Sequence, residues 1–271
     1  VEVWMTVRDF DGGINTEQES YDLLSHTSRR DTLITQLIAE ALRVGVDGIN
    51  VDFEKITEKC GEHYIEFIRE LSVKCRQNGL VLSVDNYVPK SYNTQYDRKE
   101  QGIVADYVVI MGYDEYFAGS LKAGPVSSYN YVKEGIEETL KEVPADKIIS
   151  GIPFFTRLWK ETPKTAEQRS GEKGTEAADY SMNVESEAYG MDTAQSLVTQ
   201  AGAETSWDKD NGCNYASWET GGAKYEIWLE DEKSIEPKLK LIQKYKLAGS
   251  AEWALGQENT DIWNLIQKYV N

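Results

Sequence analysis

Apolar and polar positions along the chain follow two periodicities that alternate from the first residues to the last. Short apolar runs are typical of buried strands, and segments with apolar residues every three or four positions are typical of amphipathic helices. The pattern predicts strands at 1–7, 48–54, 80–84, 107–112, 148–152 and 249–255 and helices at 29–44, 62–77, 132–143, 234–245 and 262–270. Because strands that alternate with helices pair in parallel, we predict an α/β fold with six parallel strands.

The stretch before the last strand has a different pattern. Residues 159–202 are polar and rich in Lys, Glu, Thr and Gly, so we predict a loop-like insertion with one short helix at 193–199. Short β-rich stretches at 205–207, 214–218 and 224–229, separated by Gly-containing turns, then predict an antiparallel meander. We therefore expect a first α/β part at 1–158, an insertion subdomain at 159–230, and the last helix, the last strand and a terminal helix at 231–271. A Gly-rich turn is predicted at 11–13.

Length and composition narrow the class of protein. A chain of 271 residues, 40% of them hydrophobic, can bury one large core, and single-domain α/β barrels have this length. Lys and Arg number 29 against 46 Asp and Glu, a formal net charge of −17, which argues against binding to nucleic acids and membrane surfaces. The 7 Trp and 16 Tyr offer flat faces that stack on sugar rings, although we expect most of them in the core. A neutral or weakly charged polymer fits this composition as a substrate.

The cysteines and the apolar runs do not indicate whether the protein is located inside or outside the cell. Cys60, Cys75 and Cys213 are an odd set without CxxC spacing, so we predict no disulfide framework. No apolar run reaches the roughly 18 residues of a membrane span, and no signal peptide opens the chain. The first residues already read as a strand, so we expect a trimmed chain, with any signal peptide or further module upstream.

The segment 47–54, Asp-Gly-Ile-Asn-Val-Asp-Phe-Glu, carries the strongest chemical signal. Side chains alternate between the two faces of a strand, so Asn50, Asp52 and Glu54 share one face. Glu54 ends the predicted strand, where barrel enzymes place their catalytic groups. A carboxylate pair of this kind pushes the two pKa values apart and keeps one group protonated near neutral pH, as a general acid requires.

Two other interpretations fit the alternation. An edge strand with a solvated polar face has the same spacing, although parallel strands are covered on both faces. The same carboxylates also suit a divalent metal ion. His26 and His63 are the only histidines, and neither lies near other potential ligands, which argues against an imidazole-rich metal centre.

Four segments in the right order resemble family-18 glycoside hydrolases, the chitinase family. The segment 47–54 resembles the signature DGxDxDxE. Met-Gly-Tyr-Asp at 111–114, Gly-Ile-Pro-Phe-Phe at 151–155 and Ala-Glu-Trp at 251–253 look like the family's Met-x-Tyr-Asp, Gly-x-Pro-Phe-Tyr and last-strand Trp segments. The resemblance implies a (β/α)8 TIM barrel in which the six strands are numbers three to eight, so the first two βα units are absent from this chain.

The family resemblance also implies a mechanism, substrate-assisted retention. Glu54 is expected to protonate the glycosidic oxygen and later to act as the base for water. Asp52 is expected to orient the 2-acetamido group of the substrate, whose oxygen attacks the anomeric carbon. Tyr113 is expected to hydrogen-bond this group, Asp114 to support the site and Trp253 to form an aromatic floor. The resemblance implies no cofactor and no metal.

Finer features resemble one bacterial branch of the family. Asn50 stands where the commoner signature has Asp, so one charge beside Asp52 is missing and we expect an altered pH profile. Asn50 and the segments 113–120, 124–126 and 227–231 together resemble the spore cortex-lytic N-acetylglucosaminidases of peptidoglycan. This resemblance implies that Glu115 either contacts substrate or is a solvated loop residue. This branch implies a secreted protein associated with the cell wall or spore. The alternatives are a chitinase and a family-18 lectin without catalysis. Endo or exo cleavage and the oligomeric state are not predicted.

Overall fold

The computed structural model describes residues 1–10 and 16–270, so the turn predicted at 11–13 lies outside the described residues. Two compact units make up the chain. The first unit contains Val1–Met111, Gly135–Ser150 and Lys246–Gly249, and the second contains Gly112–Glu134, Gly151–Tyr245 and Ser250–Asn271.

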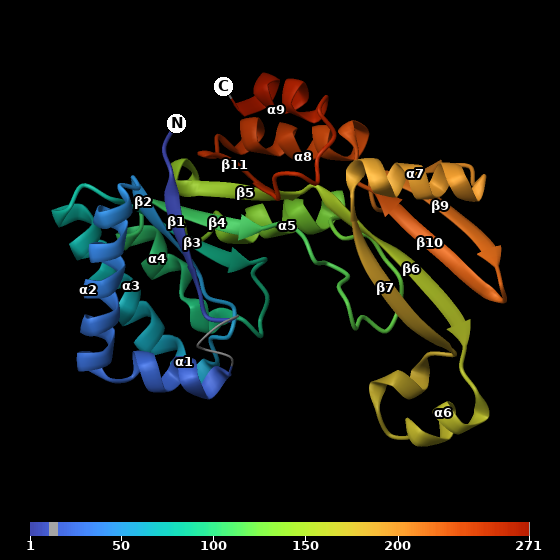
Figure 1. The fold of residues 1–271 in the computed structure, drawn as a ribbon, viewed down its shortest axis with the longest axis horizontal. Coiled ribbons are helices and arrows are strands. Elements are labelled where there is room, and N and C mark those ends of the chain that lie inside the picture. Colours follow the sequence, from blue (N-terminus) through green and yellow to red (C-terminus); the bar gives the residue numbers. More distant parts are fainter. Residues whose placement is uncertain (11–15, 271) are drawn as a thin grey trace. The chain divides into compact units, whose positions relative to one another are not determined.

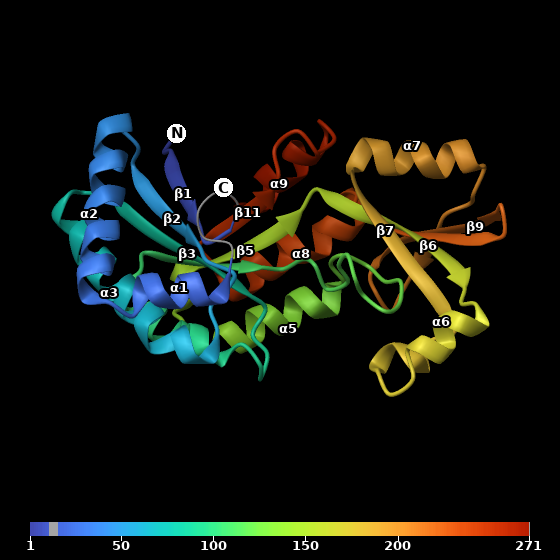
Figure 2. The same ribbon diagram turned by 60° about the horizontal axis from the view of Figure 1, so that its bottom comes forward.

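The predicted alternation of strands and helices is confirmed in the first unit (Figures 1 and 2). Its elements are β1 (Trp4–Arg8), α1 (Glu17–Leu24), α2 (Thr27–Val44), β2 (Gly48–Asp52), α3 (Gly61–Gln77), β3 (Val81–Tyr87), α4 (Arg98–Val104) and β4 (Tyr107–Met111). Helix α5 (Tyr129–Thr139) ends in this unit, and β5 (Ile148–Pro153) and β11 (Gly249–Trp253) begin in it. The six predicted strands form one sheet in the order β1-β2-β3-β4-β5-β11. The pairs from β1 to β5 are parallel.

The core of the first unit lies where the strands meet the helices that follow them. Ile49 and Val51 on β2 are fully buried, as are Phe67, Ile68 and Leu71 on α3. The spacing of three and four residues on α3 places these side chains on one stripe that packs on the sheet. The other face of the strands is thereby left for polar side chains.

The opposite face of this sheet is concave. The rings of Trp4 on β1 and Tyr107 on β4 stack with centroids 5.6 Å apart, although two strands separate β1 from β4. Neighbouring strands lie about 4.8 Å apart, so a flat sheet would keep these rings about 14 Å apart. Gly48 allows the approach, because a Cβ there would lie 2.8 Å from Trp4 Cδ1. Polar residues on this face therefore point into a curved surface.

The second unit contains an antiparallel sheet in the order β7-β6-β10-β9-β8. Its strands are β6 (Phe155–Pro163), β7 (Met182–Gly190), β8 (Ser206–Asp208), β9 (Cys213–Thr220) and β10 (Ala223–Leu229), and its helices are α6 (Ala166–Gly171), α7 (Met191–Ala201), α8 (Glu232–Tyr245) and α9 (Ile262–Val270). Ala194 and Val198 of α7 pack on Ala216 and Ile227 of the sheet. The predicted meander is confirmed as β8, β9 and β10.

The loop-like character predicted for 159–202 is wrong. Strands β6 and β7 each have nine residues and pair along their whole length, and α7 is longer than the helix predicted at 193–199. Smaller differences concern strand ends, since β2 ends at Asp52 and β3 continues to Tyr87. The three cysteines are free and buried. Within residues 1–10 and 16–270, no helix combines the length and apolar character that crossing a bilayer requires.

Candidate active site

Strand β2 presents the predicted polar face to the concave side of the first unit. Ile49 and Val51 are fully buried against the helices, so Asn50 and Asp52 project from the opposite face. Strand β2 lies between β1 and β3, which rules out the interpretation of a solvated edge strand. Asp52 is only 8% exposed although it is a carboxylate.

Glu54 follows two residues after the end of β2, and the side chain of Asp9 holds its backbone in place. The Asp9 carboxylate accepts the N–H groups of Glu54 and Lys55, each at 2.8 Å, and the hydroxyl of Ser20 at 3.3 Å. Asp9 is fully buried and follows directly after β1. A buried carboxylate that accepts several hydrogen bonds is strongly constrained. Asp9 thus ties the chain after β2 to the end of β1.

The side chain of Glu54 is oriented by a residue of the neighbouring strand. The hydroxyl of Tyr87, the last residue of β3, donates a hydrogen bond of 2.5 Å to Glu54 Oε2. Burial, and then the bond to Glu54, raises the pKa of Tyr87, so that this hydroxyl keeps its proton. Tyr87 therefore fixes one oxygen of Glu54 and leaves the other available.

Asp52 lies in an environment that favours its protonated form. Burial raises the pKa of Asp52 to about 6, the charges of Glu54 and Asp9 add to the increase, and Arg8 opposes it. Its Oδ1 atom is buried and finds no hydrogen-bond partner among the described residues. The first unit thus brings together Asn50, Asp52 and Glu54, and burial raises the pKa of Asp52 to about 6.

The second unit holds Tyr113, Asp114 and Glu115 in the segment that follows β4. The rings of Tyr113 and Phe155 meet edge to face at 6.1 Å. Asp114 has a left-handed φ of 55°, and its Oδ1 lies 3.7 Å from Arg157 Nη2. Burial raises the pKa of Asp114, whereas Arg157 lowers it.

Glu115 is bonded within its own loop. Its Oε2 accepts the N–H of Ser128 at 2.8 Å, just before α5, and its own N–H donates to the carbonyl of Val126 at 2.9 Å. These bonds close the loop between Tyr113 and α5. The contact between Glu115 and substrate stays a prediction.

Trp253, at the end of β11, presents an open aromatic surface. Its side chain is 49% exposed, and its carbonyl accepts the N–H of Phe154 at 2.7 Å. The backbone is thus anchored while the ring remains accessible. An exposed ring on a fixed backbone is suited to stacking on a sugar.

Three residues that touch or neighbour the predicted group were missed from the sequence: Asp9, Asp85 and Tyr87. Asp85 on β3 accepts a hydrogen bond from Asn50 Nδ2 at 2.8 Å. In the described part of the chain, no group of three or more His, Cys, Asp or Glu side chains is arranged to hold a metal ion.

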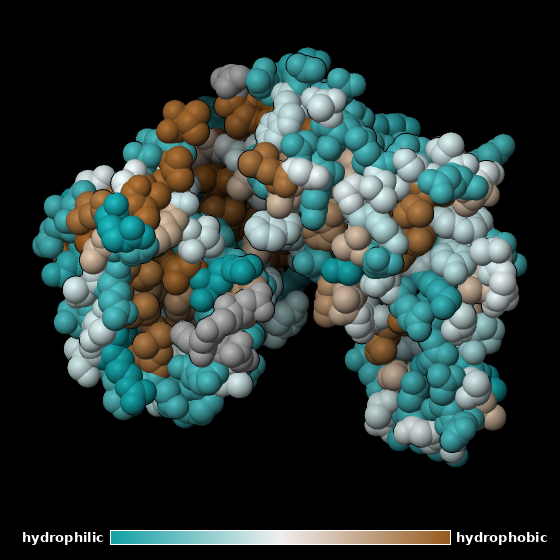
Figure 3. Space-filling view, viewed as in Figure 1, coloured by the Kyte–Doolittle hydropathy of each residue, from teal (hydrophilic) through white to brown (hydrophobic). Residues whose placement is uncertain are grey.

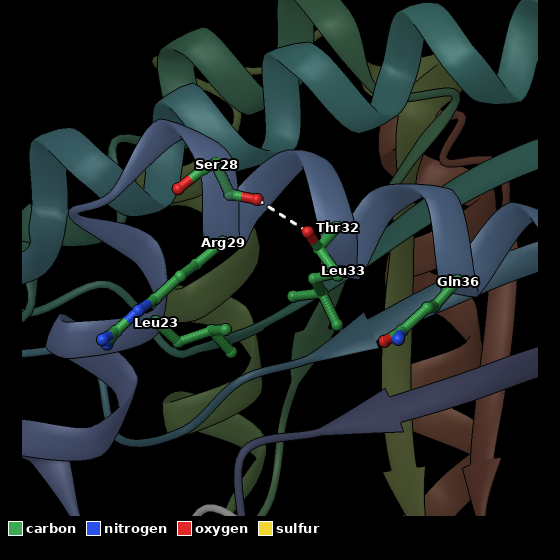
Figure 4. A pocket seen from close by; sticks show the side chains of 6 residues that line it. All are labelled: Leu23, Ser28, Arg29, Thr32, Leu33 and Gln36. Carbon is green, nitrogen blue, oxygen red and sulfur yellow. Dashed lines mark hydrogen bonds between the residues drawn. The ribbon is translucent and has the colours of Figure 1, made fainter.

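A surface pocket elsewhere in the first unit is of a different kind. It has a volume of about 300 Å³ and is lined by Leu23, Ser28, Arg29, Thr32, Leu33 and Gln36 (Figure 4). Figure 3 shows apolar side chains gathered beside α2 on the visible face of this unit. Its lining shares no residue with the site around Glu54.

The chain is similar to bacterial glycosidases over nearly all of its length. It is 27% identical to the "Uncharacterized glycosylase YvbX" of Bacillus subtilis (strain 168), over 97% of this chain and 71% of the relative. It is 28% identical to the "Cortical fragment-lytic enzyme" of the same organism, over 92% of this chain but only 56% of that enzyme.

Solved structures share the fold. The spore cortex-lytic enzyme SleL of Bacillus megaterium QM B1551 superimposes with a TM-score of 0.84 at 23% identity, over 100% of this chain and 60% of that one. The chitinase of Chromobacterium violaceum ATCC 12472 gives 0.85 at 23% identity, over 100% and 80%. The family model for glycosyl hydrolases family 18 matches residues 11–258, as the four sequence segments predicted. The chain therefore belongs to glycosyl hydrolases family 18.

Proposed function

We propose that this protein hydrolyses β-1,4 bonds after N-acetylglucosamine in peptidoglycan of the spore-cortex type. The observation that carries the proposal is the arrangement around Glu54. Asp9 holds the backbone of Glu54, and Tyr87 bonds its side chain. The carboxylate of Asp52 lies close enough for the charge of Glu54 to raise its pKa. Relatives named as a cortical fragment-lytic enzyme and a sporulation-specific glycosylase support this class of substrate. On this proposal the protein acts outside the cell or in the spore.

The mechanism that we propose is substrate-assisted retention. Glu54 donates its proton to the glycosidic oxygen, while the acetamido oxygen of the substrate attacks the anomeric carbon. Asp52 accepts the acetamido N–H and stabilises the cyclic cation. Tyr113 bonds the same group, and Trp253 stacks beneath the sugar. Glu54 then removes a proton from the water that opens the intermediate.

The six parallel strands correspond, on this proposal, to strands three to eight of a (β/α)8 barrel. The curved face of the first unit supports this assignment, because the sheet of a barrel curves around the barrel axis. Asp52 and Glu54 lie at the carboxyl end of β2, where barrel enzymes hold their catalytic groups. The cortical fragment-lytic relative and the SleL structure are both longer than this chain, which spans 56% and 60% of them.

Chitin is the alternative substrate. The fold is shared with the chitinase of Chromobacterium violaceum and with a Cycas revoluta chitinase solved in complex with (GlcNAc)3. Both substrates present the N-acetyl group that the mechanism uses, so the geometry of Asp52 and Glu54 suits either. Lectin activity without catalysis is less well supported, because Glu54 and Asp52 are both present.

Product analysis tests the proposal. The purified protein is incubated with spore-cortex peptidoglycan and, separately, with chitin oligosaccharides, and the products are identified by mass spectrometry. We expect cortex fragments that end in reducing N-acetylglucosamine. Cleavage of chitin alone would assign the protein to the chitinases, and binding without cleavage of either polymer would support the lectin.

Tyr87→Phe tests the orientation of the acid. The variant removes the hydroxyl that bonds Glu54 Oε2 while leaving the ring. A hydrogen bond to a charged group contributes roughly 1.5–3 kcal/mol, so we expect kcat/KM to fall about tenfold or more. Tyr92→Phe is the matched control, since Tyr92 is 79% exposed. Equal rates for the two variants would show that Tyr87 does not orient Glu54.

A further inference from the structure

A second carboxylate faces Asp52 from the neighbouring strand. The pairing of β2 with β3 runs through Asn50–Ser83 to Val51–Val84, so the next residues along the two strands are Asp52 and Asp85. Residues at matching positions of neighbouring strands project from the same face, about 4.8 Å apart. Asp85 thus lies beside Asp52 on the concave face.

Asn50 fixes the orientation of Asp85. Its Nδ2 donates to Asp85 Oδ1 and to Ser83 Oγ, both at 2.8 Å. The amide of Asn50 cannot titrate, whereas Asp85 can. The carboxylate that the DGxDxDxE pattern places at position 50 is absent here, and a carboxylate stands instead one strand away.

Burial raises the pKa values of both aspartates toward neutral pH. Burial raises the pKa of Asp85 to about 7, Asn50 opposes the increase, and the charges of Asp52 and Glu54 add to it. The other charged or titratable groups near the pair are Arg8, Asp9, Tyr64 and Tyr87, and Val109 lies opposite Asp85 on β4. Like charges this close cannot both ionise freely, so they titrate as a pair.

We propose that Asp85 is a positioning residue that shares one proton with Asp52 across β2 and β3, in place of a carboxylate at position 50. Because Asn50 occupies Asp85 Oδ1, the proton resides on Asp85 Oδ2 and is donated to Asp52 Oδ1, the buried atom without a partner among the described residues. Asp52 then keeps its negative charge to accept the acetamido N–H. This role rests on the proposed function of the site.

The test compares the pH dependence of kcat/KM in variants of position 85. Asp85→Asn retains a donor toward Asp52 but cannot release a proton. We therefore expect kcat/KM below pH 6 within about threefold of the wild type, and loss of the decline that release of the shared proton from Asp85 causes in the basic limb of the wild-type profile. The exchange Asn50→Asp/Asp85→Asn returns a titrating carboxylate to β2 and should restore the wild-type basic limb. Glu62→Gln, an exposed residue in the first turn of α3, is the control for net charge.

A second measurement does not depend on activity. Carboxyl 13C NMR of the wild-type protein between pH 4 and 9 should show Asp52 titrating in two steps, the upper one coinciding with Asp85. In Asp85→Asn the Asp52 signal should have a single step, and in the exchanged variant two steps should return.

The outcomes separate the two proposals. If the wild-type protein cleaves neither polymer but its NMR titration shows the coupled steps, the proposed function is refuted and the shared proton between Asp52 and Asp85 is supported. Independent single steps in the wild type, or a basic limb that Asp85→Asn leaves unmoved, would overturn the role of Asp85. A purely structural role would lower stability without moving the basic limb.

Discussion

Replacing Glu54 by Gln should reduce hydrolysis of the N-acetylated polymer by about a thousandfold while leaving sugar binding in place, since general acid catalysis contributes roughly 10²–10⁴-fold. The amide has no proton to donate to the glycosidic oxygen. It still offers an oxygen to Tyr87, and Asp9 continues to hold the backbone, so the site should keep its shape. Initial rates and equilibrium binding of the same oligosaccharide measure the two effects separately.

Glu58→Gln serves as the control, because Glu58 is an exposed carboxylate four residues further along the chain. It should change neither rate nor binding. Full activity in Glu54→Gln would exclude Glu54 as the acid. Loss of binding together with activity would mean that the substitution disturbs the site rather than the proton transfer.

Glu230→Ala should lower the free energy of unfolding of the second unit by about 3–5 kcal/mol, because it leaves Lys238 buried without its partner. The side chains of Lys238 and Glu230 are 1% and 2% exposed, and Lys238 Nζ bonds both oxygens of Glu230 at 2.9 and 2.8 Å. Ser234 Oγ donates to Glu230 as well, at 2.9 Å. Urea unfolding followed by Trp fluorescence measures the loss, since every Trp except Trp4 lies in the second unit.

Glu185→Ala is the matched control. Its partner Lys160 is on the surface, and the exposed fractions of the two side chains are 71% and 42% for Glu185 and Lys160. Exposed ion pairs contribute roughly 0–1 kcal/mol, so this variant should unfold close to the wild type. Similar losses for the two variants would show that burial does not set the strength of the Glu230–Lys238 pair.

The sequence predicted the parallel strands and one wall of the site because both depend on local periodicity. Ile49 and Val51 alternate with Asn50 and Asp52 along β2. Because side chains alternate between the two faces of a strand, the apolar pair lies on one face and the polar pair on the other. Longer amphipathic helices were predictable for the same reason, and α9 begins and ends where its apolar spacing predicts. The short helices α1, α4 and α6 were not predicted.

The partners of Glu54 could not be predicted, because they come from other strands. Asp9 lies 45 residues before Glu54 and Tyr87 lies 33 residues after it, and only the register of the sheet brings them together. One signal was available. Ser83, Asp85 and Tyr87 alternate with apolar or buried residues, as on β2, but the predicted strand ended at Val84 and left the last two outside.

Strands β6 and β7 were missed for a physical reason. Most of their residues are at least partly exposed, so burial does not impose a regular alternation on their sequence. The exceptions are Phe155, Thr156 and Trp159 on β6, which are buried. The indole N–H of Trp159 donates to the carbonyl of Gly124 at 2.8 Å. Pairing between the two backbones, rather than a hydrophobic stripe, defines these strands.

The hydrogen bonds that Asp9 accepts affect how the backbone at Glu54 and Lys55 fluctuates. Because the amides of Glu54 and Lys55 are bonded to a side chain that follows β1, a transient opening of β1 releases both amides even while β2 stays paired with β3. Their hydrogen exchange with solvent should therefore follow the opening of β1 and not that of β2. The time for which the backbone of Glu54 stays in position is then set by β1, a strand that contributes no predicted catalytic residue.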